Sequence, residues 1–457
     1  MKNRNPSKKP RPGRRPERKK PKTLTRIDVD SLAWGGKGVG RADGKVIFVS
    51  KAVPGDSLLV KLTRIKSRYA EGAVEAVLKP SSHRVEPRCK FFSHCGGCQW
   101  LSTSYDEQLK QKELLVTQVL RHHLEGAERL PALPADPATA YRHRGTFHVK
   151  PSGGGVRIGF YQEESRKVVN LDVCLLFDDS YNERYGELRK ALKSAPQAFS
   201  VTEMTLARSE GAEQYALHLQ LARGGAGEAE ALCEAALKAG VDGVLVTPAG
   251  APERILARSG RPWTTYGLPA GLGGFRRDLE MRADVRSFTQ AHYAMNRRLV
   301  ELSVSWLGLA HHERLLELYA GLGNFTLPLS RACKEVVAVE ASPFAHEDAK
   351  ENARLAEVEN IRHVPGDAAD WTSKMVMKSD RYDALLLDPP RTGARDVVQN
   401  IRFLSPRRIL YISCNLPALD RDLGILGQQG YRLARIQPVD LFPQTYNLET
   451  VCLLERE

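Results

Sequence analysis

Two side chains that can do chemistry stand directly after apolar runs in the last third of the chain. Cys414 follows the run 408–412, and Asp388 follows the run 384–387. Such short runs, bounded by prolines, predict buried parallel strands. Because open α/β sheets bind ligands at the carboxyl ends of their strands, we expect the thiol and the carboxylate to share one site. The alternative is that Cys414 is a small core residue, since free cysteines are among the most buried residues.

A predicted strand that runs into a glycine loop lies upstream, at residues 314–324. Gly321 and Gly323 allow a tight turn and a close approach of the backbone to a ligand. Glu340 ends the next predicted strand, where an acid can bind ribose hydroxyls, and Asp367 ends the third, towards the adenine or sulfonium side. A dinucleotide is compatible with one acid and this loop. The three-glycine dinucleotide fingerprint is absent, however, so S-adenosylmethionine fits better.

Three cysteines, Cys89, Cys95 and Cys98, lie within one stretch of ten residues. A glycine pair between the last two lets their thiolates converge on one centre, and Cys174 is the nearest by sequence to complete a four-thiolate set. Zinc also accepts four thiolates, so the spacing leaves the identity of the metal open. Free thiols are the remaining alternative, and disulfides are disfavoured in a reducing compartment.

The N-terminal part of the chain has two features of an RNA-binding protein. Residues 1–22 hold eleven Lys or Arg against one Glu, so we expect a disordered basic tail that attracts phosphate backbones. A solubilising extension is the alternative. Five short strands with glycine turns predict a small barrel of the oligonucleotide-binding kind over residues 23–80. Its cationic side chains and Tyr69 suit a nucleic-acid backbone and a stacked base.

The rest of the chain predicts two larger domains. Residues 81–290 mix strands and helices, so we expect a central α+β domain that carries the four-cysteine site. Strands and helices alternate over residues 291–457, and the last two strands are connected closely enough to be antiparallel. This alternation predicts an α/β class domain with a doubly wound, Rossmann-like sheet.

Composition is that of an ordinary globular protein. The 457 residues suffice for two or three domains, with 42% hydrophobic and 27% charged residues and a net charge of +14. No apolar run approaches the roughly 18 residues that a membrane span needs. The N-terminus also lacks the apolar core of a secretory signal. We therefore expect a cytoplasmic protein that has no membrane attachment and acts as a monomer.

Taken together, these motifs resemble those of the RNA uracil-5-methyltransferases, which use S-adenosylmethionine. Residues 35–56 closely resemble a TRAM domain, an RNA-binding module, and the overall resemblance runs from about residue 23 to the end. Its most specific signals are the cysteine trio, the loop 318–328, Asp388-Pro-Pro-Arg391, Ser413-Cys-Asn415 and Asp440-Leu-Phe-Pro-Gln-Thr445. A TRAM domain followed by a four-cysteine cluster is the layout of the family's 23S rRNA branch.

The resemblance implies a role for each candidate residue. Four cysteines would hold a [4Fe-4S] cluster: Cys89, Cys95, Cys98 and Cys174. Six residues would line the methyl-donor site: Gln290, Tyr319, Asn324, Glu340, Asp367 and Asp388. Cys414 would add to carbon 6 of uracil and so make carbon 5 nucleophilic. Glu449 would then remove the carbon 5 proton, although an ordinary charge at a strand start is the alternative.

Two departures from the family pattern stand near the predicted site. Leu416 separates Ser413-Cys-Asn415 from Pro417, where the family usually has proline at once, and residues 444–447 lack the histidines commonly found ahead of the base. Both concern substrate positioning more than donor binding. The predicted function is methylation of carbon 5 of a uridine in 23S rRNA. The alternatives are a tRNA substrate and a non-catalytic RNA-binding assembly factor.

Overall fold

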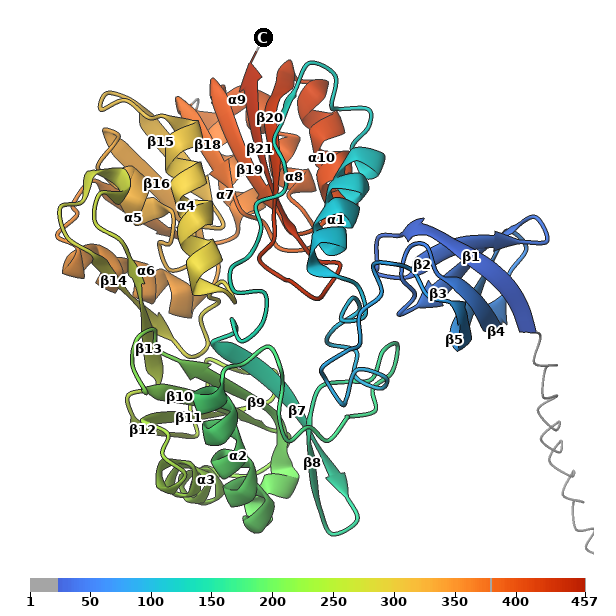
Figure 1. Cartoon of the computed structure of the whole chain (residues 1–457). Coiled ribbons are helices and arrows are strands. Elements are labelled where there is room, and N and C mark those ends of the chain that lie inside the picture. The colour runs from blue at the N-terminus through green and yellow to red at the C-terminus, as the bar shows by residue number, and fades with distance from the viewer. Residues whose placement is uncertain (1–23, 379, 457) are drawn as a thin grey trace, which may run out of the picture.

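The computed structural model describes residues 24–378 and 380–456, which form one closed barrel and three sheets (Figure 1). The predicted basic tail, residues 1–22, lies outside the described residues. Among the helices of the described part, none is long and apolar enough to cross a membrane.

Five strands close into the N-terminal barrel in the order β1-β2-β3-β5-β4. They are β1 (Leu24–Leu32), β2 (Gly38–Ala42), β3 (Lys45–Ser50), β4 (Ser57–Ile65) and β5 (Tyr69–Lys79). Alternate residues such as Ile27 and Val29, or Ile47 and Val49, point into the barrel core, as the two-residue period of a strand requires. The predicted small β-barrel is confirmed.

A six-stranded sheet occupies the middle of the chain, in the order β12-β11-β10-β9-β7-β8. Its strands are β7 (Arg144–Ser152), β8 (Gly155–Gly159), β9 (Val201–Arg208), β10 (Tyr215–Leu221), β11 (Gly243–Pro248) and β12 (Ala257–Gly260). Helices α2 (Asp179–Ser194) and α3 (Ala226–Lys238) share a hydrophobic core with it. A hairpin of β13 (Trp263–Leu268) and β14 (Leu279–Asp284) follows this sheet along the chain.

The largest sheet has eight strands in the order β17-β16-β15-β18-β19-β21-β20-β6. Five of them are parallel: β15 (Arg314–Leu318), β16 (Glu335–Glu340), β17 (Ile361–Pro365), β18 (Ala384–Leu387) and β19 (Arg408–Ser413). The strands β20 (Tyr431–Val439) and β21 (Glu449–Arg456) form an antiparallel pair beside β19. This order confirms the predicted Rossmann-like fold, and the strand order reverses between β15 and β18.

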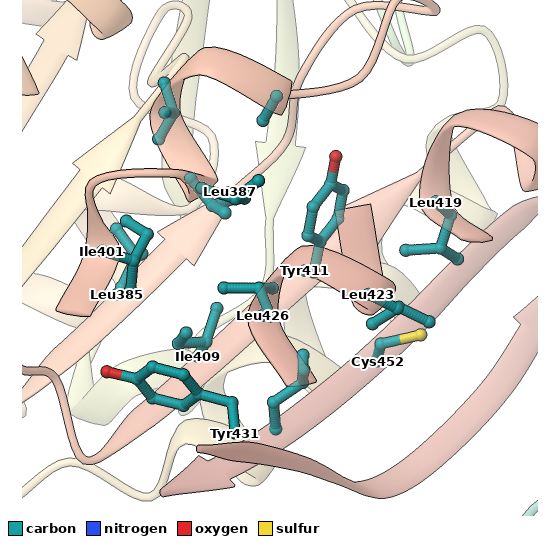
Figure 2. Close-up of a cluster of buried hydrophobic side chains, with 14 of the residues drawn as sticks. Leu385, Leu387, Ile401, Ile409, Tyr411, Leu419, Leu423, Leu426, Tyr431 and Cys452 are labelled. Atoms are coloured by element: carbon teal, nitrogen blue, oxygen red, sulfur yellow. The ribbon is translucent and has the colours of Figure 1, made fainter. Parts of the chain in front are cut away.

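Helices cover both faces of the large sheet, which explains why its central strands are apolar on both sides. One face packs against α4 (Tyr293–Leu307), α5 (Thr326–Ser330) and α6 (Pro343–Leu355). The other packs against α7 (Ala368–Lys378), α8 (Arg395–Val398), α9 (Ile401–Leu404) and α10 (Leu416–Gly427). Figure 2 shows part of this second core, where Leu419, Leu423 and Leu426 of α10 lie over Ile409 and Tyr411 of β19.

One helix from early in the chain also joins this core. Helix α1 (Tyr105–Val119) packs against α10 and β20 (Figure 1). The short strand β6 (Glu128–Arg129) extends the sheet beside β20. The chain therefore contributes α1 and β6 to the large sheet before it forms the six-stranded sheet. The predicted domain boundaries at residues 80 and 290 remain predictions.

Candidate active site

Four predicted site residues stand at the carboxyl ends of neighbouring parallel strands. Tyr319 follows β15, Glu340 ends β16, Asp388 follows β18 and Cys414 follows β19. Glu449 begins β21, which runs antiparallel to β19, so that the start of one strand lies beside the end of the other, with Thr450 opposite Ser413. The sheet thus gathers donor-side and cysteine-side residues along one edge, at the point where the strand order reverses.

The glycine loop after β15 is held by the carboxylate of Glu340. Gly321 N donates to Glu340 Oε2 at 2.8 Å, and Ser342 N donates to Oε1 at 2.6 Å. Gly321 has φ +59°, a left-handed conformation that costs glycine little. Each carboxylate oxygen keeps a further lone pair, so Glu340 can hold the loop and still accept hydrogen bonds from two hydroxyls.

Tyr319 adopts φ +65°, which is uncommon for a residue with a Cβ. Such strain persists only where the surrounding structure fixes it, and it often marks a functional site. The side chain is partly buried, and burial raises the pKa of its phenol to about 12. Tyr319 therefore remains a neutral hydrogen-bonding side chain at physiological pH.

The side chain of Asn324 is mostly engaged by protein groups. Its Oδ1 accepts from Tyr266 Oη at 2.9 Å and from Asn296 Nδ2 at 2.8 Å, and its Nδ2 donates to Asn296 Oδ1 at 2.9 Å. Asn324 consequently anchors the glycine loop to β13 and α4, with one N–H left for a ligand. Sequence reasoning missed Tyr266 and Asn296, which have no motif of their own.

Asp367 lies at the exposed start of α7 and caps that helix. Its Oδ1 accepts from the backbone N–H of Ala369 at 2.8 Å and of Asp370 at 3.1 Å. An aspartate directly before a helix commonly satisfies these otherwise unpaired donors. The helix cap accounts for one of its oxygens, and only the other remains for a ligand.

Gln290 lies in the loop before α4 and is 8% exposed. Its Oε1 is buried and has no hydrogen-bond partner within the described part of the chain. Neighbouring residues fix this loop, because Ser287 Oγ donates to Asp348 Oδ2 at 2.6 Å and His143 Nε2 lies 3.3 Å from Thr289 Oγ1. A buried acceptor without a partner is costly, so Gln290 is suited to a ligand that brings a donor.

Cys414 sits between β19 and α10, close to two acids. Burial, with added effects of the Glu449 and Asp388 charges, raises the pKa of its thiol to about 12. Arg391 has a smaller opposing effect on that pKa. Asn415 caps α10 by accepting from Ala418 N at 3.0 Å. The unusual Leu416 is only 1% exposed and packs in the core below, so it leaves the cysteine at the strand end.

The two acids beside Cys414 both resist ionisation. Burial raises the pKa of Asp388 to about 7. Burial and then the negative charge of Asp388 hold the pKa of Glu449 well above its usual range. Glu449 is 4% exposed, and its Oε2 has no partner among the residues described. Acids with raised pKa values beside a nucleophile are the arrangement in which proton transfer near neutral pH is possible.

The four predicted metal-ligand cysteines line one small enclosed cavity with apolar walls: Cys89, Cys95, Cys98 and Cys174. None of the eight cysteines of the chain, all of which the structure describes, forms a disulfide. Within the described residues, no three His, Cys, Asp or Glu side chains are arranged to hold a metal ion. Burial raises the pKa of Cys174 to about 11 and also raises that of Cys95. The donor set fits a thiolate-held group, while the side chains are not in ligating positions.

Comparison with known families agrees with this geometry. Residues 268–457 match the family model described as tRNA (Uracil-5-)-methyltransferase, and residues 19–74 match that of the TRAM domain. An uncharacterized RNA methyltransferase of Thermosynechococcus vestitus is 36% identical, covering 94% of this chain and 97% of its own. The 23S rRNA (uracil(1939)-C(5))-methyltransferase RlmD of Aeromonas hydrophila is 32% identical, covering 94% of this chain and 96% of its own.

A solved structure has the same overall fold. The Pyrococcus abyssi tRNA (uracil-54, C5)-methyltransferase in complex with S-adenosyl-L-homocysteine superimposes with a TM-score of 0.72. The match covers 94% of this chain and 99% of that one, at 22% sequence identity. At this identity the likeness concerns the fold.

Proposed function

The chain belongs to the RNA uracil-5-methyltransferase family, and we propose that it methylates carbon 5 of one uridine in 23S rRNA through a covalent Cys414 adduct. The enzyme depends on S-adenosylmethionine, as members of this family do. The observation that carries the proposal is the meeting of Cys414, Asp388 and Glu449 beside the glycine loop, where each acid raises the pKa of the thiol.

The first step needs a thiolate, because carbon 5 of uracil is a poor nucleophile. The Cys414 sulfur adds its electron pair to carbon 6, and the ring becomes an enolate that is nucleophilic at carbon 5. Arg391, whose charge lowers the pKa of Cys414, also stabilises the enolate oxygen. The uridine has to leave its stack to reach the sulfur.

S-adenosylmethionine, when bound, supplies the methyl group and a positive sulfonium charge. Glu340 binds its ribose hydroxyls, and Tyr319, Asn324, Asp388 and Gln290 line the rest of that site, with Asp367 at its adenine side. A positive charge near Asp388 favours the ionised carboxylates over the protonated ones. The ionised Asp388 can then accept the proton of the Cys414 thiol, which leaves Glu449 able to act as the base in the last step.

The last step removes the proton from carbon 5. Glu449 accepts that proton, the C–H electron pair restores the ring double bond, and the bond between carbon 6 and sulfur breaks to return the Cys414 thiolate. The unpartnered Glu449 Oε2 supports this role, because it is free to face a substrate.

The four cysteines hold a [4Fe-4S] cluster in this proposal, supported by their place on the walls of one small cavity. Anaerobically purified protein tests the cluster, since iron–sulfur centres absorb near about 400 nm. A colourless protein with stoichiometric zinc would replace the cluster with a zinc site.

The rRNA substrate is supported by the 32% identity to an rRNA methyltransferase over nearly the whole chain, whereas the tRNA enzyme shares the fold at 22% identity. Mapping 5-methyluridine in total RNA, with and without the gene, tests it. We expect one 23S rRNA site to lose its methyl group. Loss from tRNA alone would make tRNA the substrate.

A further inference from the structure

The loop of residues 440–448 connects β20 to β21 and leads directly into Glu449. Val439, the last residue of β20, pairs with Glu449, the first of β21, so both ends of the loop meet at the acid. The loop contains the whole motif Asp440-Leu-Phe-Pro-Gln-Thr445, to which the reaction itself gives no role. Asp440, Gln444 and Thr445 are nevertheless all buried.

A buried ion pair fixes the first part of this loop. Lys112 Nζ of α1 donates to Asp440 Oδ1 at 2.6 Å, and both side chains are 1% exposed. The same ammonium donates to Phe442 O at 3.2 Å, and Tyr105 Oη donates to Asp440 Oδ2 at 2.9 Å. A buried ion pair is favourable only where extra hydrogen bonds satisfy both partners, as they do here.

A reciprocal amide pair fixes the middle of the loop. Gln108 Nε2 donates to Gln444 Oε1 at 3.0 Å, and Gln444 N donates to Gln108 Oε1 at 2.9 Å. Gln444 has φ +71°, a conformation that is strained for a residue with a Cβ. Its carbonyl accepts from the backbone N–H of Gln99 and of Trp100, each at 3.1 Å. The strained residue is thus held from three sides.

Two separate parts of the chain meet at Gln444. One is α1, and the other is the segment directly after Cys98, whose next two backbone N–H groups donate to the loop. Glu449 follows the loop directly as the first residue of β21, and its Oε2 makes no hydrogen bond within the described residues, so the path of the loop bears on where this carboxylate lies.

We propose that Gln108 and Lys112 are positioning residues for Glu449, holding the 440–448 loop so that the acid can remove the carbon 5 proton. The inference rests on the proposed function. It assigns the Asp440-to-Thr445 motif to the second half of the reaction. A displacement of about 1 Å from a remote change can cost a catalytic group a large factor in rate. The alternative is that these contacts merely attach α1 to the sheet.

Single-turnover reactions of the full chain with labelled S-adenosylmethionine and the mapped RNA separate the two roles. Label entering RNA measures methyl transfer, and decay of the denaturant-resistant RNA–protein adduct measures proton removal. In Gln108→Met, which keeps the side-chain volume, we expect methyl transfer close to wild type and adduct decay slower by about tenfold. Glu449→Gln is the benchmark in which the adduct persists.

Gln111→Met is the matched control. Gln111 lies one turn further along α1 and is also buried, but its Oε1 accepts from Leu32 N of the barrel. We expect its adduct to decay at the wild-type rate. Equal slowing of transfer and decay in Gln108→Met, or unchanged decay, would overturn the inference.

A milder variant covers the case in which Gln108→Met fails to fold. Tyr105→Phe removes one hydroxyl from Asp440, and we expect adduct decay to slow by about threefold with methyl transfer retained. Unchanged decay in this variant would equally overturn the inference. If the proposed function itself fails, the wild type forms no adduct. If only the positioning role fails, the wild type and Glu449→Gln behave as expected and these variants do not.

Discussion

The donor side and the cysteine side of the active site differ in how their polar groups are satisfied. On the donor side, Glu340 accepts two backbone N–H bonds and Asn324 makes three side-chain bonds. On the cysteine side, Glu449 has a buried oxygen without a described partner, and burial raises the pKa values of Asp388 and Cys414. These two donor-side residues are satisfied as folded, although the buried Oε1 of Gln290 is not, whereas the cysteine side carries a burial cost that a substrate or a cation can offset.

This difference shows which groups of the site can still change when a substrate binds. Groups that already have partners can fix a loop but gain little when a ligand arrives. Groups held neutral by burial change protonation state when a charge enters, which is what acid–base chemistry near pH 7 requires. We therefore expect substitutions of Cys414 and Glu449 to change rate and pH dependence, and those of Glu340 and Asn324 to change donor affinity and stability. Asp388 belongs to both sides, so its substitution should change both sets of properties.

The largest effect is expected for Cys414→Ala. Removing the nucleophile should lower methyl transfer by a factor on the order of 10⁴ or more and abolish the adduct with 5-fluorouridine RNA. Gel electrophoresis under denaturing conditions measures the adduct. Cys452→Ala is the control, because Cys452 is a fully buried core residue of β21 and should leave adduct formation intact. An adduct in Cys414→Ala would place the nucleophile elsewhere.

Asp388→Asn should separate stability from activity. The folded pKa of about 7 lies above the unfolded value, so wild-type stability falls as pH rises towards 7 and the cost is complete above it. We expect the variant to gain on the order of 4 kcal/mol of unfolding free energy at pH 8, with a gain that shrinks towards pH 5. Donor affinity should fall because the carboxylate is lost. Denaturant titrations at several pH values measure the first effect.

A gain for Asp388→Asn that did not depend on pH would contradict a buried, ionising Asp388. Removing the Asp388 carboxylate should also lower the pKa of Glu449, since the Asp388 charge raises that pKa. The acid limb of the pH–rate profile that belongs to Glu449 should then move to lower pH in whatever activity remains.

Gly321→Ala should have the smallest effect, and on donor affinity in particular. At φ +59° the added Cβ meets no atom within 4 Å, so the cost is backbone strain of about 1 kcal/mol. We expect weaker S-adenosylmethionine binding by calorimetry, with adduct decay unchanged. Gly44→Ala is the control, since Gly44 has φ +71° and open space in a barrel turn far along the chain. Equal S-adenosylmethionine affinity in both variants would show that the glycine loop is not part of the donor site.

Much of the fold followed from local patterns. Apolar runs that end at Asp388 and Cys414 predicted parallel strands, and the structure has β18 and β19 there because buried strands are apolar on both faces. The glycine turns of the barrel were likewise predicted from neighbouring residues alone. In contrast, α1 gave a helical pattern but no sign that it packs on the large sheet, because a helix's partner is not encoded in its own spacing.

The candidate site divides in the same way. Sequence by itself determined which reactive side chains stand at strand ends, since strand period and chain order dictate that placement. The contact of Gln108 with Gln444, separated by 336 positions, and the engagement of Asn324 by Tyr266 came only from the tertiary structure. The protonation states also came only from the tertiary structure. The raised pKa values of Asp388, Cys414 and Glu449 arise from burial and neighbouring charge, which exist only once distant segments have packed.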